Sequence, residues 1–210
     1  MTIDVAHHLG AVQRSVRALE RDGKPARAVI LTRVYDTDQA DLWHALTSAE
    51  RLPRWFLPVE GDLKLGGRYQ LKGNAGGTIT DCEPPAHLGL TWEMQGQVSW
   101  VDVHLQSESA TRTRFTLTHT ASLSDFWKQF GPGAVGVGWE LGLMGMALHL
   151  ADPAAKFDEA AFGASPESKA YMTGSSEQWG EAAIAGGEDP EQARAAARNT
   201  TAFYTGQPPA

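Results

Sequence analysis

The sequence is poor in cysteine, and Cys82 is the only one among its 210 residues. A single thiol cannot form an internal disulfide or build a metal cluster from several cysteine ligands. The chain also lacks the basic start and apolar run of a secretory signal peptide. These absences predict a protein of the reducing cytoplasm, whose length allows a substantial core without covalent cross-links.

Long apolar runs are also missing. The longest, residues 134–150, contains Glu140 and several glycines and falls short of the roughly 20 residues that span a bilayer. We interpret it as a buried closing helix, apolar on nearly every side, which must pack on more than one face. One face would meet a sheet, and the other would meet the C-terminal segment or a second subunit in a homodimer.

Positive charge is scarce, and the formal net charge is -7. Nucleic acids and anionic membranes attract clustered Lys and Arg, so we expect neither as a partner. Most of the negative charge lies in residues 152–210, which hold nine acids and four bases, whereas residues 1–27 hold five bases and three acids. We therefore expect the two ends of the chain to attract each other.

The N-terminal segment, residues 1–24, has apolar residues at spacings of four and three. This pattern predicts an amphipathic helix that ends at Asp22-Gly23. The apolar stripe consists of Val5, Leu9, Val12, Val16 and Leu19.

Residues 25–151 are predicted to form one α+β domain. A β-branched segment at 27–35 predicts a strand, two short helices follow, and Gly and Pro then punctuate a series of short strands that starts at 62–65. The spacing predicts a curved antiparallel sheet of about six or seven strands. Two strands alternate, so that one face carries Val101, Val103 and Leu105, and the next carries Phe115, Leu117 and His119.

Residues 152–205 are predicted to form a helical acidic extension packed on the domain. Ser165-Pro166 and Asp189-Pro190 are typical helix starts, because each places a capping side chain just before a proline. The last residues, 206–210, are expected to fray.

The order of these elements, read with particular residues, resembles the bacterial homologues of the activator of the heat-shock protein 90 ATPase. These belong to the START-like superfamily (SRPBCC, helix-grip fold), and the likeness extends from about Arg27 to Leu150. The matching segments are 41–47 (DLWHALT), 52–58 (LPRWFLP), 61–63 (GDL), 66–69 (GGRY), 84–85 (PP), 91–92 (TW), 116–120 (TLTHT) and 138–140 (GWE).

The resemblance implies a helix-grip fold with a long C-terminal helix and a cavity between sheet and helix, but it implies no reaction. Relatives in the wider superfamily include lipid carriers, hormone receptors and cyclases, and fold alone does not choose among them. The ligand-pocket positions that it implies are Trp43, Trp55, Phe56, Trp92, Phe115, His119, Trp139 and Leu143.

Two titratable residues are candidates for catalysis. His119 falls on an apolar face, where it would either contact a ligand or be satisfied by the backbone or a nearby hydroxyl. Glu140 lies in the apolar closing helix and would either orient a ligand or pair with an arginine such as Arg54 or Arg68.

Metal and nucleotide sites are not predicted. The histidines show no metal-ligand spacing. Residues 131–136 (GPGAVG) spell G-x-G-x-x-G but are surrounded by an antiparallel meander, so we expect no dinucleotide and no other cofactor.

Three hypotheses remain. The first is binding of a small hydrophobic ligand without an assigned reaction. The second is a cyclase- or hydrolase-like enzyme in which His119 and Glu140 transfer protons. The third is a partner-binding or chaperone-associated protein.

Overall fold

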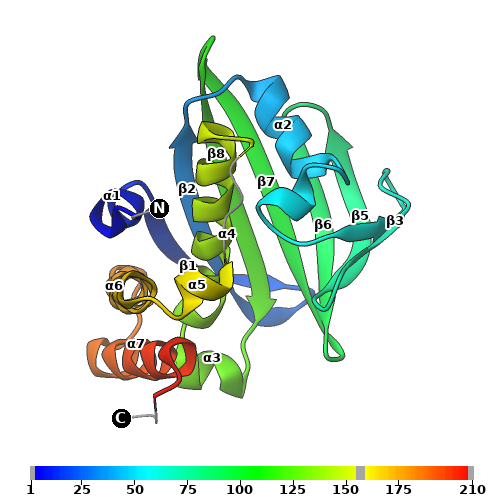
Figure 1. Ribbon diagram of the computed structural model, residues 1–210. Helices are drawn as coiled ribbons and strands as arrows, with labels where there is room; N and C mark the ends of the chain where they lie inside the picture. Colours follow the sequence, from blue (N-terminus) through cyan, green and yellow to red (C-terminus); the bar gives the residue numbers. More distant parts are fainter. Residues whose placement is uncertain (1–2, 155–158, 208–210) are drawn as a thin grey trace. The chain divides into compact units, whose positions relative to one another are not determined.

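The computed structural model describes residues 3–154 and 159–207 (Figure 1). The strands are β1 (Gln13–Arg21), β2 (Lys24–Tyr35), β3 (Val59–Gly61), β4 (Arg68–Leu71), β5 (Gly76–Glu83), β6 (His87–Met94), β7 (Gln97–Ser109) and β8 (Arg112–Ser122). The helices are α1 (Val5–Gly10), α2 (Gln39–Thr47), the 3-10 turn η1 (Leu52–Arg54), α3 (Asp125–Phe130), α4 (Gly133–Ala151), α5 (Glu159–Gly163), α6 (Pro166–Ala185) and α7 (Pro190–Thr205).

The described chain forms two compact units. The core unit comprises Thr32–Ala121 and Gly142–Phe157, and the flank unit comprises Met1–Leu31, Ser122–Leu141 and Asp158–Ala210. The division falls inside β2 and inside α4, so each of these two elements contributes residues to both units.

The sheet has the strand order β1-β2-β8-β7-β6-β5-β4-β3. Strands β3 to β8 pair antiparallel, each with its neighbour in sequence. The expected α+β helix-grip class is confirmed, although the sheet has eight strands rather than six or seven. Residues 62–65, predicted as a strand, lie in the loop after β3, where Leu65 is 60% exposed.

The prediction of one N-terminal helix through Leu19 was wrong. Helix α1 ends at Gly10, and residues 13–21 form strand β1. Asp22 and Gly23 both have positive φ, at 52° and 71°, as the two central residues of a type I′ hairpin turn require. The spacing of four between Val12 and Val16 also fits one face of a strand, and Asp-Gly marked a hairpin rather than a helix end.

The expected alternation on β7 and β8 is confirmed. Val101, Val103 and Leu105 lie directly opposite His119, Leu117 and Phe115, and all six side chains are buried. Because side chains on paired strands share a face with those directly opposite them, these residues form one apolar face of the sheet.

Helix α4 covers this sheet in the core unit. The hydroxyl of Tyr35, on β2, donates a hydrogen bond to the carbonyl oxygen of Leu143 at 3.1 Å. By length and composition alone α4 could cross a membrane, a test that core helices of globular domains also pass. Its place against the sheet identifies it as the closing helix of the grip.

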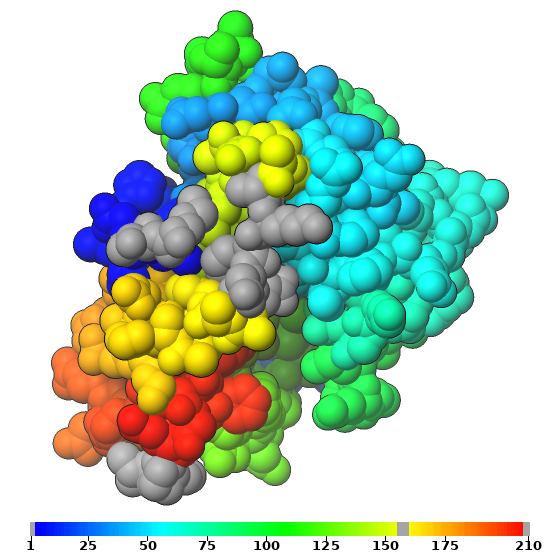
Figure 2. Space-filling model, in the orientation of Figure 1, coloured from blue at the N-terminus to red at the C-terminus, as the bar shows by residue number. Residues whose placement is uncertain are grey.

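The C-terminal extension contains the two expected helices, α6 and α7. The side chain of Ser165 caps α6 and that of Asp189 caps α7, each by accepting a hydrogen bond from a backbone N–H of the first turn. Within the flank unit α6 packs on α1 and β1, and α7 packs on α3, which it adjoins on the surface in Figure 2. The predicted fraying lies, from residue 208 onward, outside the described residues.

The two ends of the chain attract each other, as their charges predict. Arg27 Nε lies 2.7 Å from Glu188 Oε1 in an ion pair between β2 and the turn before α7. Arg14 also donates a hydrogen bond to the side-chain oxygen of Gln178 on α6.

Candidate functional site

One row of apolar side chains in the middle of the sheet is incompletely covered. Leu88 and Leu90, on β6, lie opposite the buried Val103 and Val101, and Trp92 lies opposite Ser99. The three β6 side chains therefore share the face that α4 closes, but they are only half-buried. A central strand is normally covered on its apolar face, so this row is the first candidate for a ligand surface.

The row continues into an apolar cluster around β4 and β5. Tyr69, Leu71 and Ile79 are buried there and form the centre of the cluster. Half-buried side chains pack around this centre from the segment after η1 and from strands β3, β5 and β6. They are Phe56, Leu57, Val59, Cys82, Leu88, Leu90 and Trp92.

Trp55 and Phe56 form a stacked aromatic pair beside α4. Their ring centroids are 5.5 Å apart, and the indole N–H of Trp55 donates to the carbonyl oxygen of Ala45 on α2. Gly142 and Gly145 face this pair, and a side chain at Gly145 would meet the carbonyl oxygen of Trp55 at 2.6 Å. Glycine at position 145 thus lets α4 approach the backbone of the segment after η1.

His119 is the polar group next to the half-buried row. Its Nε2 lies 2.8 Å from Ser99 Oγ, and its ring centroid lies 6.2 Å from that of Trp92. Ser99 Oγ donates its only proton to the carbonyl oxygen of Trp92 at 3.2 Å, so Nε2–H of His119 donates to Ser99. The nearby hydroxyl thus satisfies the imidazole, which is one of the two alternatives considered for this residue.

Burial lowers the pKa of His119 to about 4 because the surrounding apolar groups disfavour the charged imidazolium. The side chain is therefore neutral at physiological pH. A neutral imidazole that donates through Nε2 is a fixed polar contact rather than a charged one.

The other predicted pocket residues have different surroundings. Phe115 is buried and meets the ring of Tyr35 edge-on at 6.1 Å, and Leu143 is buried on α4. Trp43 is half-buried on α2. The core unit thus holds seven of the eight predicted pocket residues, whereas Trp139 belongs to the flank unit.

Glu140, the second catalytic candidate, is fully buried in the flank unit and pairs with Arg14. Arg14 Nε donates to Oε1 at 2.7 Å and Nη2 to Oε2 at 2.5 Å, a two-pronged arrangement. The indole N–H of Trp179 donates to Oε1 at 2.6 Å, and the hydroxyl of Tyr171 lies 3.5 Å from Oε2. An arginine pair was one of the two alternatives, but the partner is Arg14 rather than Arg54 or Arg68.

The sequence interpretation missed several residues of these two clusters. Ser99 has no motif around it, and only the pairing of β7 with β8 places it beside His119. Arg14 could have been found, since a buried acid on an apolar helix needs a cation, but its segment was predicted to be an N-terminal helix. Trp179 was not among the predicted site residues.

Metal-ligand geometry does not occur in the described parts of the chain: no group of three or more His, Cys, Asp or Glu side chains there is placed to hold an ion. The half-buried row is an apolar surface next to the neutral imidazole of His119 and the hydroxyl of Ser99.

A protein-family model matches more than half of the chain. The model described as activator of Hsp90 ATPase homolog 1-like protein matches residues 36–150. The chain belongs to this family. The match covers α2 through nearly all of α4 and leaves out β1, β2 and the C-terminal extension.

Solved structures extend the likeness beyond the family domain. The crystal structure of CalU16 from Micromonospora echinospora is 29% identical, with a TM-score of 0.69 over 83% of this chain and 99% of that one. The solution structure of CalU16 is also 29% identical, with a TM-score of 0.66 over 84% and 97% of the two chains.

A more distant structure shares the fold alone. It is the conserved protein EF2215 from Enterococcus faecalis, whose function is unknown, at 16% identity and a TM-score of 0.61 over 84% of this chain and 93% of that one. The comparison with curated protein sequences gave no match.

Proposed function

We propose that the core unit binds a small hydrophobic molecule against the half-buried row Leu88, Leu90 and Trp92. The observation that carries this proposal is the contrast within one sheet face. The side chains of β7 and β8 are buried, whereas their direct neighbours on β6 are half-buried. An apolar ligand that covers the row would complete the burial of that face.

The expected driving force is the hydrophobic effect. Fully burying a leucine or aromatic side chain contributes roughly 1.5–3 kcal/mol, so completing the burial of three half-covered ones contributes roughly 3 kcal/mol. The aromatic surfaces of Trp55, Phe56 and Trp92 add flat walls of the kind that pockets use.

His119 and Ser99 would give this apolar surface one oriented polar contact. Both protons of this pair are already donated, so Ser99 Oγ is left to accept a hydrogen bond from a ligand. Because the imidazole is neutral, we expect a ligand with an uncharged hydroxyl group near Trp92 rather than one that needs an ion pair. Fatty alcohols and hydroxylated aromatic polyketides are suitable classes for a first screen.

Binding is favoured over proton-transfer catalysis by the partners of the two catalytic candidates. Ser99 already accepts from Nε2 of His119, and Arg14 and Trp179 donate to the carboxylate oxygens of Glu140. A cytoplasmic location is part of this proposal, and a chaperone-associated role remains a separate prediction.

The test compares two tryptophans on opposite faces of the sheet. Native mass spectrometry and a thermal-shift screen with fatty alcohols and hydroxylated aromatic polyketides identify a binding probe. Calorimetry then measures its affinity for Trp92→Ala and for the control Trp100→Ala. Trp100 is on β7 and lies opposite Thr91 of β6, so its side chain points to the other face of the sheet. We expect at least tenfold weaker binding for Trp92→Ala and little change for Trp100→Ala.

Two results would overturn the proposal. One is that no probe binds at millimolar concentration. The other is that both variants lose affinity equally while circular dichroism shows both to be folded. The variant Trp92→Phe keeps an aromatic wall and should retain most of the affinity, which separates loss of the wall from loss of the fold.

A further inference from the structure

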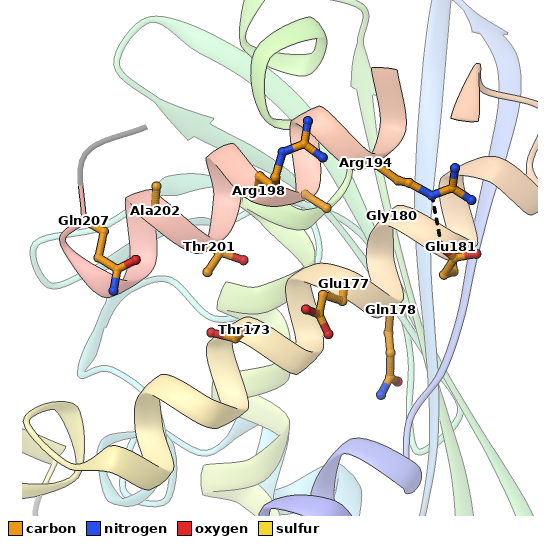
Figure 3. Close-up of a pocket in the computed structure, with 11 residues that line it drawn as sticks. Thr173, Glu177, Gln178, Gly180, Glu181, Arg194, Arg198, Thr201, Ala202 and Gln207 are labelled. Carbon is orange, nitrogen blue, oxygen red and sulfur yellow. Dashed lines mark ion pairs between the residues drawn. The ribbon is translucent and has the colours of Figure 1, made fainter. Parts of the chain in front are cut away.

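A groove of about 680 Å³ runs between α6 and α7 in the flank unit (Figure 3). It is separate from the half-buried row on β6, and the family model does not cover it. Its lining includes Thr173 and Glu177 of α6 together with Arg198 and Thr201 of α7.

Small residues set the depth of this groove. A side chain at Gly180 would meet the Cβ of Ala197 at 3.0 Å, so α6 and α7 approach closely at that point. The turn between them spans only residues 186–189, and the two helices therefore run antiparallel. Close packing leaves a floor of glycine, alanine and threonine between two rims of longer side chains.

The two rims carry opposite charges. Glu177 and Glu181 stand one turn apart on α6, and Arg194 and Arg198 stand one turn apart on α7. A long ion pair crosses the groove, with Arg194 Nε 3.9 Å from Glu181 Oε1, and both side chains are mostly exposed. Such a pair contributes little by itself.

Glu177 and Arg198 stand at the next level of the groove. The antiparallel direction of the helices places them one turn beyond the pair formed by Glu181 and Arg194. Among the described residues, neither Glu177 nor Arg198 takes part in an ion pair or hydrogen bond. Each is exposed, so both charges are available to a partner.

We propose that this groove is a self-association surface and that its occupant is the α6–α7 hairpin of a second copy of this chain. A two-fold axis along the groove places α6 of one copy over α7 of the other. Each acidic rim then faces a basic rim at the same level, and Glu177 meets Arg198 of the second copy. The small-residue floor allows the two hairpins to approach and form a four-helix arrangement.

The charge pattern selects this symmetry. A two-fold axis across the groove would place α6 over α6 and acids over acids, which repels. A free anion or cation would meet both signs at once and gain little. The complementary rims therefore favour a second copy over either alternative.

The test uses charge reversal on the full-length chain. Light scattering coupled to size exclusion is expected to show a dimer for the natural sequence at micromolar concentration. Glu177→Arg makes the groove more basic and Arg198→Glu makes it more acidic, and each should raise the dimer dissociation constant at least tenfold. Arg17→Glu, an exposed reversal on β1, is the matched control and should leave the dimer unchanged.

Mixing the two variants is the decisive step. One acidic groove and one basic groove complement each other at both contacts, so an equimolar mixture of Glu177→Arg and Arg198→Glu should recover a heterodimer. A natural chain that stays monomeric at 100 µM and low salt overturns the proposal. So does a dimer that either variant retains, or a mixture of folded variants that fails to recover it.

Discussion

Two buried titratable groups, Glu140 in the flank unit and His119 in the core unit, differ in how their burial is compensated. In the flank unit Glu140 has a full set of partners, Arg14, Trp179 and Tyr171, so that its burial is compensated by ionic hydrogen bonds. In the core unit burial lowers the pKa of His119, which is neutral and shares a hydroxyl with the half-buried row. The flank unit thus fills its own interior, whereas the core unit leaves an apolar face incompletely covered.

Removing Arg14 should have the largest effect on the free energy of unfolding, because it leaves the buried acid of the flank unit without its cation. Arg14→Met leaves the Glu140 carboxylate buried without its cation, which typically costs about 3–5 kcal/mol of unfolding free energy. Urea denaturation measures the loss. Adding Glu140→Gln to Arg14→Met should restore part of it, and equal stabilities of the single variant and the natural chain would contradict the account.

Acid should destabilise the core unit through His119. The folded-state pKa, about 4, lies below the ordinary value of 6.5, so the unfolded chain takes up the proton first as pH falls. This stabilisation is complete above about pH 6.5 and is lost down to pH 4, a total of about 3 kcal/mol.

The test is the stability of His119→Gln from pH 7 to pH 4. The variant should lose less unfolding free energy over this range than the natural chain, whereas His104→Gln on the opposite, exposed face should follow the natural chain. An identical pH dependence of all three proteins would show that His119 is not buried as described.

Two glycines of α4 should respond in opposite directions. Gly145→Ala places a methyl group 2.6 Å from the carbonyl oxygen of Trp55 and should cost about 1–3 kcal/mol. Gly142→Ala meets the Phe56 ring at 3.5 Å and the Trp55 ring at 4.0 Å, which are ordinary van der Waals contacts, and should stabilise the helix by about 0.5–1 kcal/mol. Thermal unfolding of both variants tests how closely α4 approaches the segment after η1; equal effects would contradict the described packing.

The smallest expected effect is that of the partly exposed ion pair between Arg27 and Glu188 in the flank unit. Arg27→Ala removes the partly exposed ion pair with Glu188 and should cost at most about 1 kcal/mol. The same denaturation experiment measures it beside Arg14→Met. A cost similar to that of Arg14→Met would contradict the distinction between the buried ion pair of Arg14 and the partly exposed ion pair of Arg27.

The sequence predicted the parts of the fold that depend on local pattern. Alternation placed Val101 to Leu105 and Phe115 to His119 on one face, and capping residues located α6 and α7. It failed at residues 12–21, where a spacing of four fits both a helix and a strand and only the Asp22-Gly23 turn distinguishes them.

The site was less predictable than the fold because it depends on contacts between segments far apart in sequence. His119 could be recognised from its apolar face, but its partner Ser99 follows only from the register of β7 with β8 and β6. Glu140 could be recognised as a buried acid, yet Arg14 lies 126 residues away on a strand that was taken for a helix.

The most direct test of the central claim is to locate a bound probe by nuclear magnetic resonance. With 1-decanol or 1-naphthol added to the isotopically labelled full chain, we predict nuclear Overhauser contacts from the probe to the side chains of Leu88, Leu90 and Trp92. Contacts confined to the α6–α7 groove, or saturable binding without any contact to β6, would contradict the account.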